Sequence, residues 1–266
     1  MSRYRPKRST GVGLVAALAL FAALLVAGIA TAGNAPVKVR SGNLEFTANG
    51  GFTPTTLPKK TLAPIAFSAS GKIATVDGTH PPALKEVLVE ADKNTAVFVK
   101  GYPTCKASQL QSQDSAKAEA ICKPALIGKG TTDVSIEFPE QAPIPANSKL
   151  LVFNGGESGG VTTFLIHAYI TVPTPAAVVT TVKIKKIHKG RFGTYSVASV
   201  PKIAGGSGSV TSFSLTVGKK YTYKGKKVSV LSAKCPDGKL QAHGTAVFSD
   251  GTRASAEIIR TCTGKG

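Results

Sequence analysis

Tryptophan is absent from this chain of 266 residues, methionine occurs once, and only 14 residues are aspartate or glutamate. The lack of tryptophan disfavours carbohydrate recognition by ring stacking. The few carboxylates argue against a calcium loop, which needs several oxygen ligands, and against the carboxylate pair of a glycosidase. No H-E-x-x-H, Walker or EF-hand spacing occurs. We therefore expect no metal, no cofactor and no enzymatic activity.

The N-terminal segment, by contrast, has a recognisable pattern. Its cations are Arg3, Arg5, Lys7 and Arg8, and an uncharged run at 14–30 follows them. Ala30 and Ala32 suit the small-residue positions of a cleavage site, so residues 1–32 are predicted to be a secretory signal peptide. The alternative is an uncleaved N-terminal membrane anchor, because about twenty uncharged residues span a bilayer. Both interpretations place the remaining chain outside the cytoplasm, as a secreted or envelope-associated protein.

The chain has four cysteines: Cys105, Cys122, Cys235 and Cys262. An even number in an exported chain predicts two disulfides. We favour the pairs 105–122 and 235–262, because the members of each pair lie in one local module. A metal site is not expected, since no C-x-x-C spacing and no neighbouring pair of histidines accompanies the cysteines.

The second pair constrains the strands around it. Turn sequences at 236–239 and 250–251 predict three antiparallel runs, with Cys235 at the end of the first and Cys262 at the end of the third. In a flat sheet these residues would lie two strand spacings apart, roughly 9–10 Å. A disulfide needs Cα atoms closer than about 7 Å. Either the outer runs belong to facing sheets, or the tail after Arg260 folds back.

Short β-branched runs separated by Gly, Pro, Asn and Asp predict an all-β fold. We expect an antiparallel β-sandwich, Ig-like or jelly-roll-like, with one or two sandwich units. The expected strands are 44–47, 62–68, 85–91, 95–100, 132–138, 149–153, 161–172, 178–187, 194–200, 209–217, 226–233, 240–249 and 252–261. One short helical insertion is expected near 106–122, with Ser108 and Asp114 as N-caps, stapled by the first disulfide.

The charge is divided unevenly at Pro173-Thr174-Pro175. Residues 36–172 hold 13 Lys and Arg against 11 Asp and Glu, whereas residues 173–266 hold 16 against 3. Because prolines interrupt sheet ladders, we predict a β-sandwich domain at 36–172 and a basic β domain at 176–266. One continuous fold with strands exchanged across this point is the alternative. The basic half predicts an anionic partner, and solubility alone is the other explanation.

Two lysine-rich segments, 183–191 and 219–227, carry the functional prediction. The residues expected to contact a polyanion are Lys183, Lys185, Lys186, Lys189, Arg191, Lys219, Lys220, Tyr221, Tyr223, Lys224, Lys226 and Lys227. Charge would supply affinity, and the tyrosine rings a stacking face. The expected partner is an anionic cell-envelope polymer or membrane surface. Nucleic acid is not expected, because lysine lacks the bidentate geometry of arginine. Alternatively, the lysines only protect sheet edges.

The segment 156–160, Gly-Glu-Ser-Gly-Gly, fits the G-x-S-x-G pattern and is similar to the G-D-S-G-G around the nucleophile of trypsin-like serine proteases. An esterase elbow needs a helix after the serine, whereas 161–170 has the pattern of a strand. The upstream His80 precedes two prolines and is expected in an exposed turn. We therefore interpret 156–160 as a flexible hairpin loop, with a serine hydrolase using Ser158 as an alternative.

The strand at 161–172 has two faces by alternation. Phe164, Ile166 and their alternate neighbours form the expected core face. His167 and Tyr169 fall on the opposite face, which we expect to be solvated.

The chain resembles uncharacterised secreted proteins of high-GC Gram-positive bacteria in the stretches 153–156, 200–209 and 248–252. The resemblance implies export and a β-rich fold, and it carries no activity. The sequence therefore predicts a secreted or envelope-associated, non-enzymatic β-sandwich protein whose basic half binds a polyanion. A purely structural or adhesive module is the remaining alternative.

Overall fold

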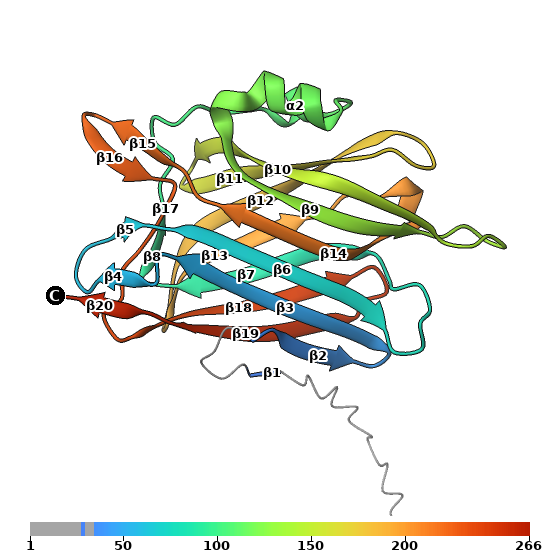
Figure 1. Cartoon of the computed structure of the whole chain (residues 1–266), viewed down its shortest axis with the longest axis horizontal. Helices are drawn as coiled ribbons and strands as arrows, with labels where there is room; N and C mark the ends of the chain where they lie inside the picture. Colours follow the sequence, from blue (N-terminus) through green and yellow to red (C-terminus); the bar gives the residue numbers. More distant parts are fainter. Residues whose placement is uncertain (1–27, 30–34) are drawn as a thin grey trace, which may run out of the picture.

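The computed structural model describes residues 28–29 and 35–266. Most of the described chain is β-strand, and nearly all neighbouring strands run antiparallel (Figure 1). The predicted signal peptide lies outside the described residues, apart from β1 (Gly28–Ile29), whose backbone pairs in parallel with residues 256–257. None of the helices in the described part is long and apolar enough to cross a membrane.

Thirteen of the described strands form one large sheet. From one edge to the other, they are β1, β19 (Arg253–Thr261), β18 (Lys239–Phe248), β7 (Leu84–Asp92), β13 (Phe192–Ser199), β12 (Ala176–Lys189), β11 (Val161–Ile170), β10 (Ile144–Ser158), β9 (Leu126–Ile136), β14 (Gly208–Val217), β6 (Ala66–Thr75), β3 (Leu44–Thr53) and β2 (Val37–Ser41). The sheet curls until β2 and β3 lie beside β19 (Figure 1). The all-β antiparallel class is thus confirmed.

The curl creates an interior in which alternate side chains from opposite ends of the sheet meet. In β2 and β3 the buried residues alternate with more exposed ones, as a half-buried strand requires. Val39 and Phe46 from these strands pack in one cluster with Phe248 and Ala256 from β18 and β19. This packing explains why an N-terminal and a C-terminal hairpin lie side by side.

Strands from the two predicted domains alternate within this sheet. β7 lies between β18 and β13, while β14 lies between β9 and β6. The residues 173–175 form the loop of a hairpin in which Ile170 pairs with Ala176. The ranges 36–172 and 176–266 therefore do not form two separate sheets. The arrangement is the continuous fold with strands exchanged across the proline segment.

Three smaller sheets lie at one end of the large sheet (Figure 1). Their strands are β5 (Ala63–Pro64), β17 (Leu231–Ala233) and β8 (Thr95–Val97) in the first, β15 (Lys220–Tyr223) and β16 (Lys226–Ser229) in the second, and β20 (Thr263–Lys265) and β4 (Thr56–Pro58) in the third. A short 3-10 turn, η2 (Ala204–Gly206), precedes β14. The first small sheet and the hairpin β15–β16 position the candidate site described below.

Both disulfides have the predicted pairing. Cys105 is bonded to Cys122, with Cα atoms 5.6 Å apart, and Cys235 to Cys262, with Cα atoms 6.1 Å apart. The second pair is possible because β17 leaves the large sheet and pairs with β5 and β8, while β18 and β19 remain in it. The outer runs thus belong to different sheets, so the three runs do not form the flat meander that the disulfide excludes.

The helical insertion consists of α1 (Ala107–Leu110), α2 (Ser115–Cys122) and a 3-10 turn, η1 (Lys123–Ala125). Asp114 caps α2 by accepting a hydrogen bond from the Lys117 amide, as predicted. Ser108 is not an N-cap, because α1 begins at Ala107. There Gln109 accepts from the Lys106 amide instead. Leu110 and Ala118 pack with Leu151 and Phe153, so the insertion covers the outer face of β10 and β11.

This cover corrects the prediction for His167, which is fully buried rather than solvated. Its Nε2 donates to the Gln113 carbonyl at 2.9 Å, in the loop between α1 and α2. Among the described residues, its Nδ1 has no hydrogen-bond partner. Burial lowers the pKa of His167 below its ordinary value. The ring is therefore held in its neutral form.

A neutral buried histidine makes stability depend on pH. Above the pKa of the unfolded chain, about 6.5, His167 is neutral in both states and the folded protein has its full stability. As the pH falls below that value, the unfolded chain binds the proton first, so the free energy of unfolding decreases. We expect urea denaturation at pH values from 7.5 to 5 to show this loss. His167→Gln keeps a donor for the Gln113 carbonyl, and it should make the free energy of unfolding change less with pH. An unchanged slope in the variant would contradict the assignment.

Candidate functional site

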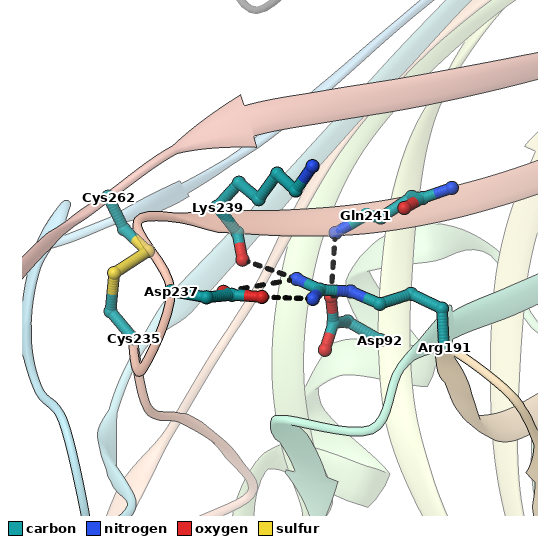
Figure 2. Close-up of a disulfide and its surroundings, with 7 residues drawn as sticks. All are labelled: Asp92, Arg191, Cys235, Asp237, Lys239, Gln241 and Cys262. Atoms are coloured by element: carbon teal, nitrogen blue, oxygen red, sulfur yellow. Dashed lines mark hydrogen bonds and ion pairs between the residues drawn. A yellow bond between two sulfur atoms is a disulfide. The ribbon is translucent and has the colours of Figure 1, made fainter.

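Arg191 lies at the centre of a charged cluster next to the second disulfide (Figure 2). Its Nε donates to Asp92 Oδ2 at 2.6 Å, and its Nη atoms donate to Asp237 and to the Lys239 carbonyl. The Asp92 side chain is 1% exposed and also accepts from the amides of Asn94 and Gln241. We call Arg191, Asp92 and Asp237 the Arg191 cluster.

The Arg191 cluster connects three segments that are distant in sequence. Arg191 belongs to the turn between β12 and β13, Asp92 ends β7, and Asp237 lies in the loop that follows Cys235. Hydrogen bonds from Arg191 hold the pKa of the Asp237 carboxyl below its ordinary value. In turn, the carboxylates of Asp237 and Asp92 raise the pKa of Arg191. Both partners are thus held in the charged form.

The β12–β13 turn contacts the β7–β8 turn closely. The Lys93 amide donates to the Arg191 carbonyl at 2.9 Å. A Cβ atom at residue 193 would lie 2.6 Å from the Lys93 Cα, so only glycine allows this approach. The backbones of the two turns are therefore in direct contact.

Beside this contact lies a cleft of about 640 Å³. Three segments line it: residues 93–100 around β8, residues 157–162 at the β10–β11 turn, and residues 184–194 of the β12–β13 hairpin. Lysines 93, 100, 185 and 186 are among the lining residues, and all four are exposed. Glu157 is the one carboxylate in the lining. We call this the lysine-rimmed cleft.

The second predicted segment forms the hairpin β15–β16, which projects from the sheet at the upper left of Figure 1. Lys224 and Gly225 have positive φ angles, 49° and 75°, and make its two-residue turn. Its exposed lysines are Lys219, Lys220, Lys224, Lys226 and Lys227. We call these residues and the two strands the lysine hairpin.

Residues 98–101 join the lysine hairpin to the lysine-rimmed cleft. Phe98 lines the cleft, and its ring centroid lies 5.6 Å from that of Tyr223. The Tyr221 hydroxyl donates to the Lys100 carbonyl at 3.0 Å. Gly101 allows the contact, since a Cβ atom there would lie 2.4 Å from the Tyr223 ring. The two lysine-rich segments thus lie on either side of one short segment.

The tyrosines of the lysine hairpin pack against neighbouring segments of the chain. Tyr221 packs edge-on against Tyr102, with ring centroids 4.9 Å apart, and its hydroxyl is bonded to backbone carbonyls. The Tyr223 ring lies against Phe98 and Gly101. Both rings are partly buried against the chain itself and anchor the lysine hairpin.

The residues of the first predicted segment divide into two groups. Lys183 and Lys185 lie on the outer face of β12, Lys185 with its Nζ 5.5 Å from the Tyr195 ring centroid. Lys186 lies on the opposite face of the strand. Both Lys185 and Lys186 are among the residues that line the cleft, whereas Lys183 is not. Lys189 instead forms an ion pair with Glu90 at 2.9 Å, and Arg191 is bonded within its cluster. The charges of Lys189 and Arg191 are therefore balanced by carboxylates of the protein itself.

Sequence reasoning missed the cleft lysines of the N-terminal half, Lys93 and Lys100. Each stands alone in a part of the chain whose charges nearly balance. Lys93 lies in the tight turn that follows Asp92. A turn was predicted there, but it does not close the predicted hairpin, because β7 pairs with β13 and β18 whereas β8 pairs with β17. No local pattern connects these lysines to residues ninety positions later, because the connection depends on the pairing of β7 with β13.

Ser158 is exposed at the end of β10, and the turn that follows is Gly159-Gly160, both with positive φ. The strand thus extends further into the 156–160 segment than predicted. No histidine within the described residues forms a hydrogen bond with Ser158. His80 is only partly exposed and contacts Ser135 at 3.3 Å and Glu137 at 3.7 Å. Both contacts use Nδ1, whereas a catalytic triad uses the two ring nitrogens separately.

Across the described residues, no three His, Cys, Asp or Glu side chains are grouped so that they could hold a metal ion. Comparisons with protein-family models, with curated proteins and with solved structures found no match to this chain. The resemblance to secreted proteins of high-GC Gram-positive bacteria therefore stays a prediction, and the function has to be inferred from the surface itself.

The Arg191 cluster makes a direct prediction for stability. Arg191→Met leaves the buried Asp92 carboxylate without its cation, so we expect a loss of about 3 kcal/mol in the free energy of unfolding. Lys189→Met, which removes an exposed partner of Glu90, should cost less than about 1 kcal/mol. Urea denaturation at pH 7 measures both. Equal costs for the two variants would show that the cluster is not the main constraint at this end of the sheet.

Proposed function

We propose that this protein is a secreted or envelope-associated binding protein without enzymatic activity, which holds an anionic envelope polymer or membrane surface through its lysines. One observation carries the proposal. The lysine hairpin contacts residues 98–101, of which Phe98 and Lys100 line the cleft together with the β12–β13 hairpin, and this arrangement supports a single positive surface to which both sequence clusters contribute.

The charges on this surface are not balanced by neighbouring acids. In the described part of the chain, none of the five lysines of the lysine hairpin forms an ion pair, and neither do the four lysines of the cleft. Like charges at close range repel one another, and a polyanion that releases its counterions relieves this repulsion. Lysine suits a partner recognised by its charge density rather than by the geometry of its groups.

The cysteines support a location outside the cytoplasm. Two disulfides indicate an oxidising environment. One of them holds the loop that carries Asp237, and so contributes to the position of the β12–β13 hairpin. An anionic polymer or lipid surface of the cell envelope is the polyanion available to such a protein.

Protection of sheet edges is the competing explanation for the lysine hairpin. β15 and β16 form a two-stranded sheet with exposed lysines on both strands, and lysine on exposed strands opposes aggregation. In that case the lysines would affect solubility without binding anything. Lys93, Lys100 and Lys186 favour the binding proposal, because they line a cleft rather than a strand edge.

The test replaces Lys220, Lys224, Lys226 and Lys227 of the lysine hairpin by glutamine. We expect its affinity for long-chain inorganic polyphosphate, and for vesicles with anionic phospholipid, to fall by about 100- to 1000-fold at low salt, since each lysine near an anionic surface contributes about 1 kcal/mol. Titration at several salt concentrations should also give a shallower dependence of log K on log salt, because fewer counterions are released.

The matched control replaces four exposed lysines outside the surface, Lys72, Lys85, Lys149 and Lys202, and so makes the same change in net charge. The control should bind nearly as the natural chain does. If both variants lose affinity equally, net charge rather than this surface is responsible. If neither loses affinity but the hairpin variant aggregates, edge protection explains the lysines. Polyphosphate binding without vesicle binding identifies a polymer as the partner.

A further inference from the structure

The lysine-rimmed cleft has two chemically different parts. Its lysines and His188 are exposed, whereas other lining side chains are apolar and partly buried. The apolar ones are Val97, Phe98, Ile184, Ile187 and Phe192. A surface that only binds a hydrated polyanion has no use for a recessed apolar floor, because such a polymer contacts the cationic rim alone.

The apolar floor is part of the packed structure rather than a loose loop surface. Val97 and Ile184 pack against the buried cluster that contains Val99, Val152 and Phe164. Lys186 lies on the same face of β12 as Ile184, two residues along the strand, so a cation stands directly beside the apolar side chains. Lys93 and Gly193, whose backbones are in close contact, also line the cleft.

We infer that this cleft binds an amphiphilic anion: a single-chain molecule whose carboxylate or phosphate head lies among the lysines and whose alkyl chain lies on the apolar floor. The volume of about 640 Å³ is within the range of roughly 300–1000 Å³ found for small-molecule sites. Four lysines against the single carboxylate of Glu157 select a negative head. The floor selects a chain, because burying each methylene group is favourable.

This inference does not depend on the proposed polymer binding. The cleft lysines also belong to the proposed polyanion surface, but the five lysines of the lysine hairpin are absent from the cleft lining, so the two sites share only part of their cations. The affinity for a polyanion would depend on the number of lysine charges, whereas the affinity for the cleft ligand would depend on the length of its alkyl chain. The two properties can therefore fail separately.

The experiment measures the affinity of hexyl, octyl, decyl and dodecyl phosphate by calorimetry, below their micelle concentrations, with the full disulfide-bonded protein. We expect affinity to rise by about fourfold for each methylene group buried, since burial of one contributes about 0.8 kcal/mol, and to stop rising once the floor is covered. Inorganic phosphate and alkyltrimethylammonium ions of the same chain lengths should bind at least 100-fold more weakly than dodecyl phosphate.

Two substitutions test the two parts of the cleft. Ile187→Ser should weaken dodecyl phosphate at least fivefold while leaving polyphosphate binding unchanged. Lys186→Gln removes a cation that contacts the phosphate head, so it should lower the affinity for the alkyl phosphates of every chain length by a similar factor. The matched controls are Ile121→Ser, on the exposed side of α2, and Lys224→Gln, at the tip of the lysine hairpin; neither should change the affinity for dodecyl phosphate.

Affinity that does not depend on chain length would overturn the inference, and so would equal binding of the alkyltrimethylammonium ions. Polyphosphate binding that persists in that case leaves the proposed function intact. Chain-length-dependent binding without any binding of polyphosphate would instead support the cleft and contradict the polymer proposal. Thermal unfolding of each variant establishes that an altered affinity is not caused by loss of the fold.

Discussion

The ion pair between Arg191 and the buried Asp92 is the interaction on which this end of the molecule depends. It joins the β12–β13 turn to the end of β7, and Asp237 extends it to the loop beside the Cys235–Cys262 disulfide. A buried carboxylate is costly without a charged partner and further donors. Asp92 has both, because two backbone amides also donate to it. The cleft exists because this cluster holds one hairpin against another turn.

Around the Arg191 cluster, some residues hold the structure together and others remain exposed at the lysine-rich surface. Arg191 and Lys189 form ion pairs within the protein, and the rings of Tyr221 and Tyr223 pack against neighbouring aromatic rings. The remaining lysines stay exposed around a common segment. An exposed positive surface built on buried ionic and aromatic anchors is suited to a partner that is itself extended and negatively charged. We propose that the apolar floor within it adds a second, more selective kind of recognition.

Much of the fold followed from the sequence. The strand at 85–91, the turn at Asp92 and the disulfide pairs were predicted correctly, since alternation, turn residues and loop geometry are local signals. Ile65 divides the predicted 62–68 strand into β5 and β6, and β2 and β15 were missed because they are short or lysine-rich. The burial of His167 depends on an insertion that packs over β11, and the partners of Arg191 depend on long-range pairing. Neither the burial of His167 nor the partners of Arg191 can be read from a short stretch of sequence.

The most direct test of the account is chemical-shift mapping by NMR during titration of the disulfide-bonded protein with long-chain polyphosphate at low salt. The account predicts that perturbed amides lie in three segments, 93–101, 183–190 and 219–227, and that they change together along one titration curve. Perturbations spread over lysines throughout the sheet, including Lys72 and Lys149, would contradict it. So would perturbation of only one of the three segments, since the claim is that they form a single surface.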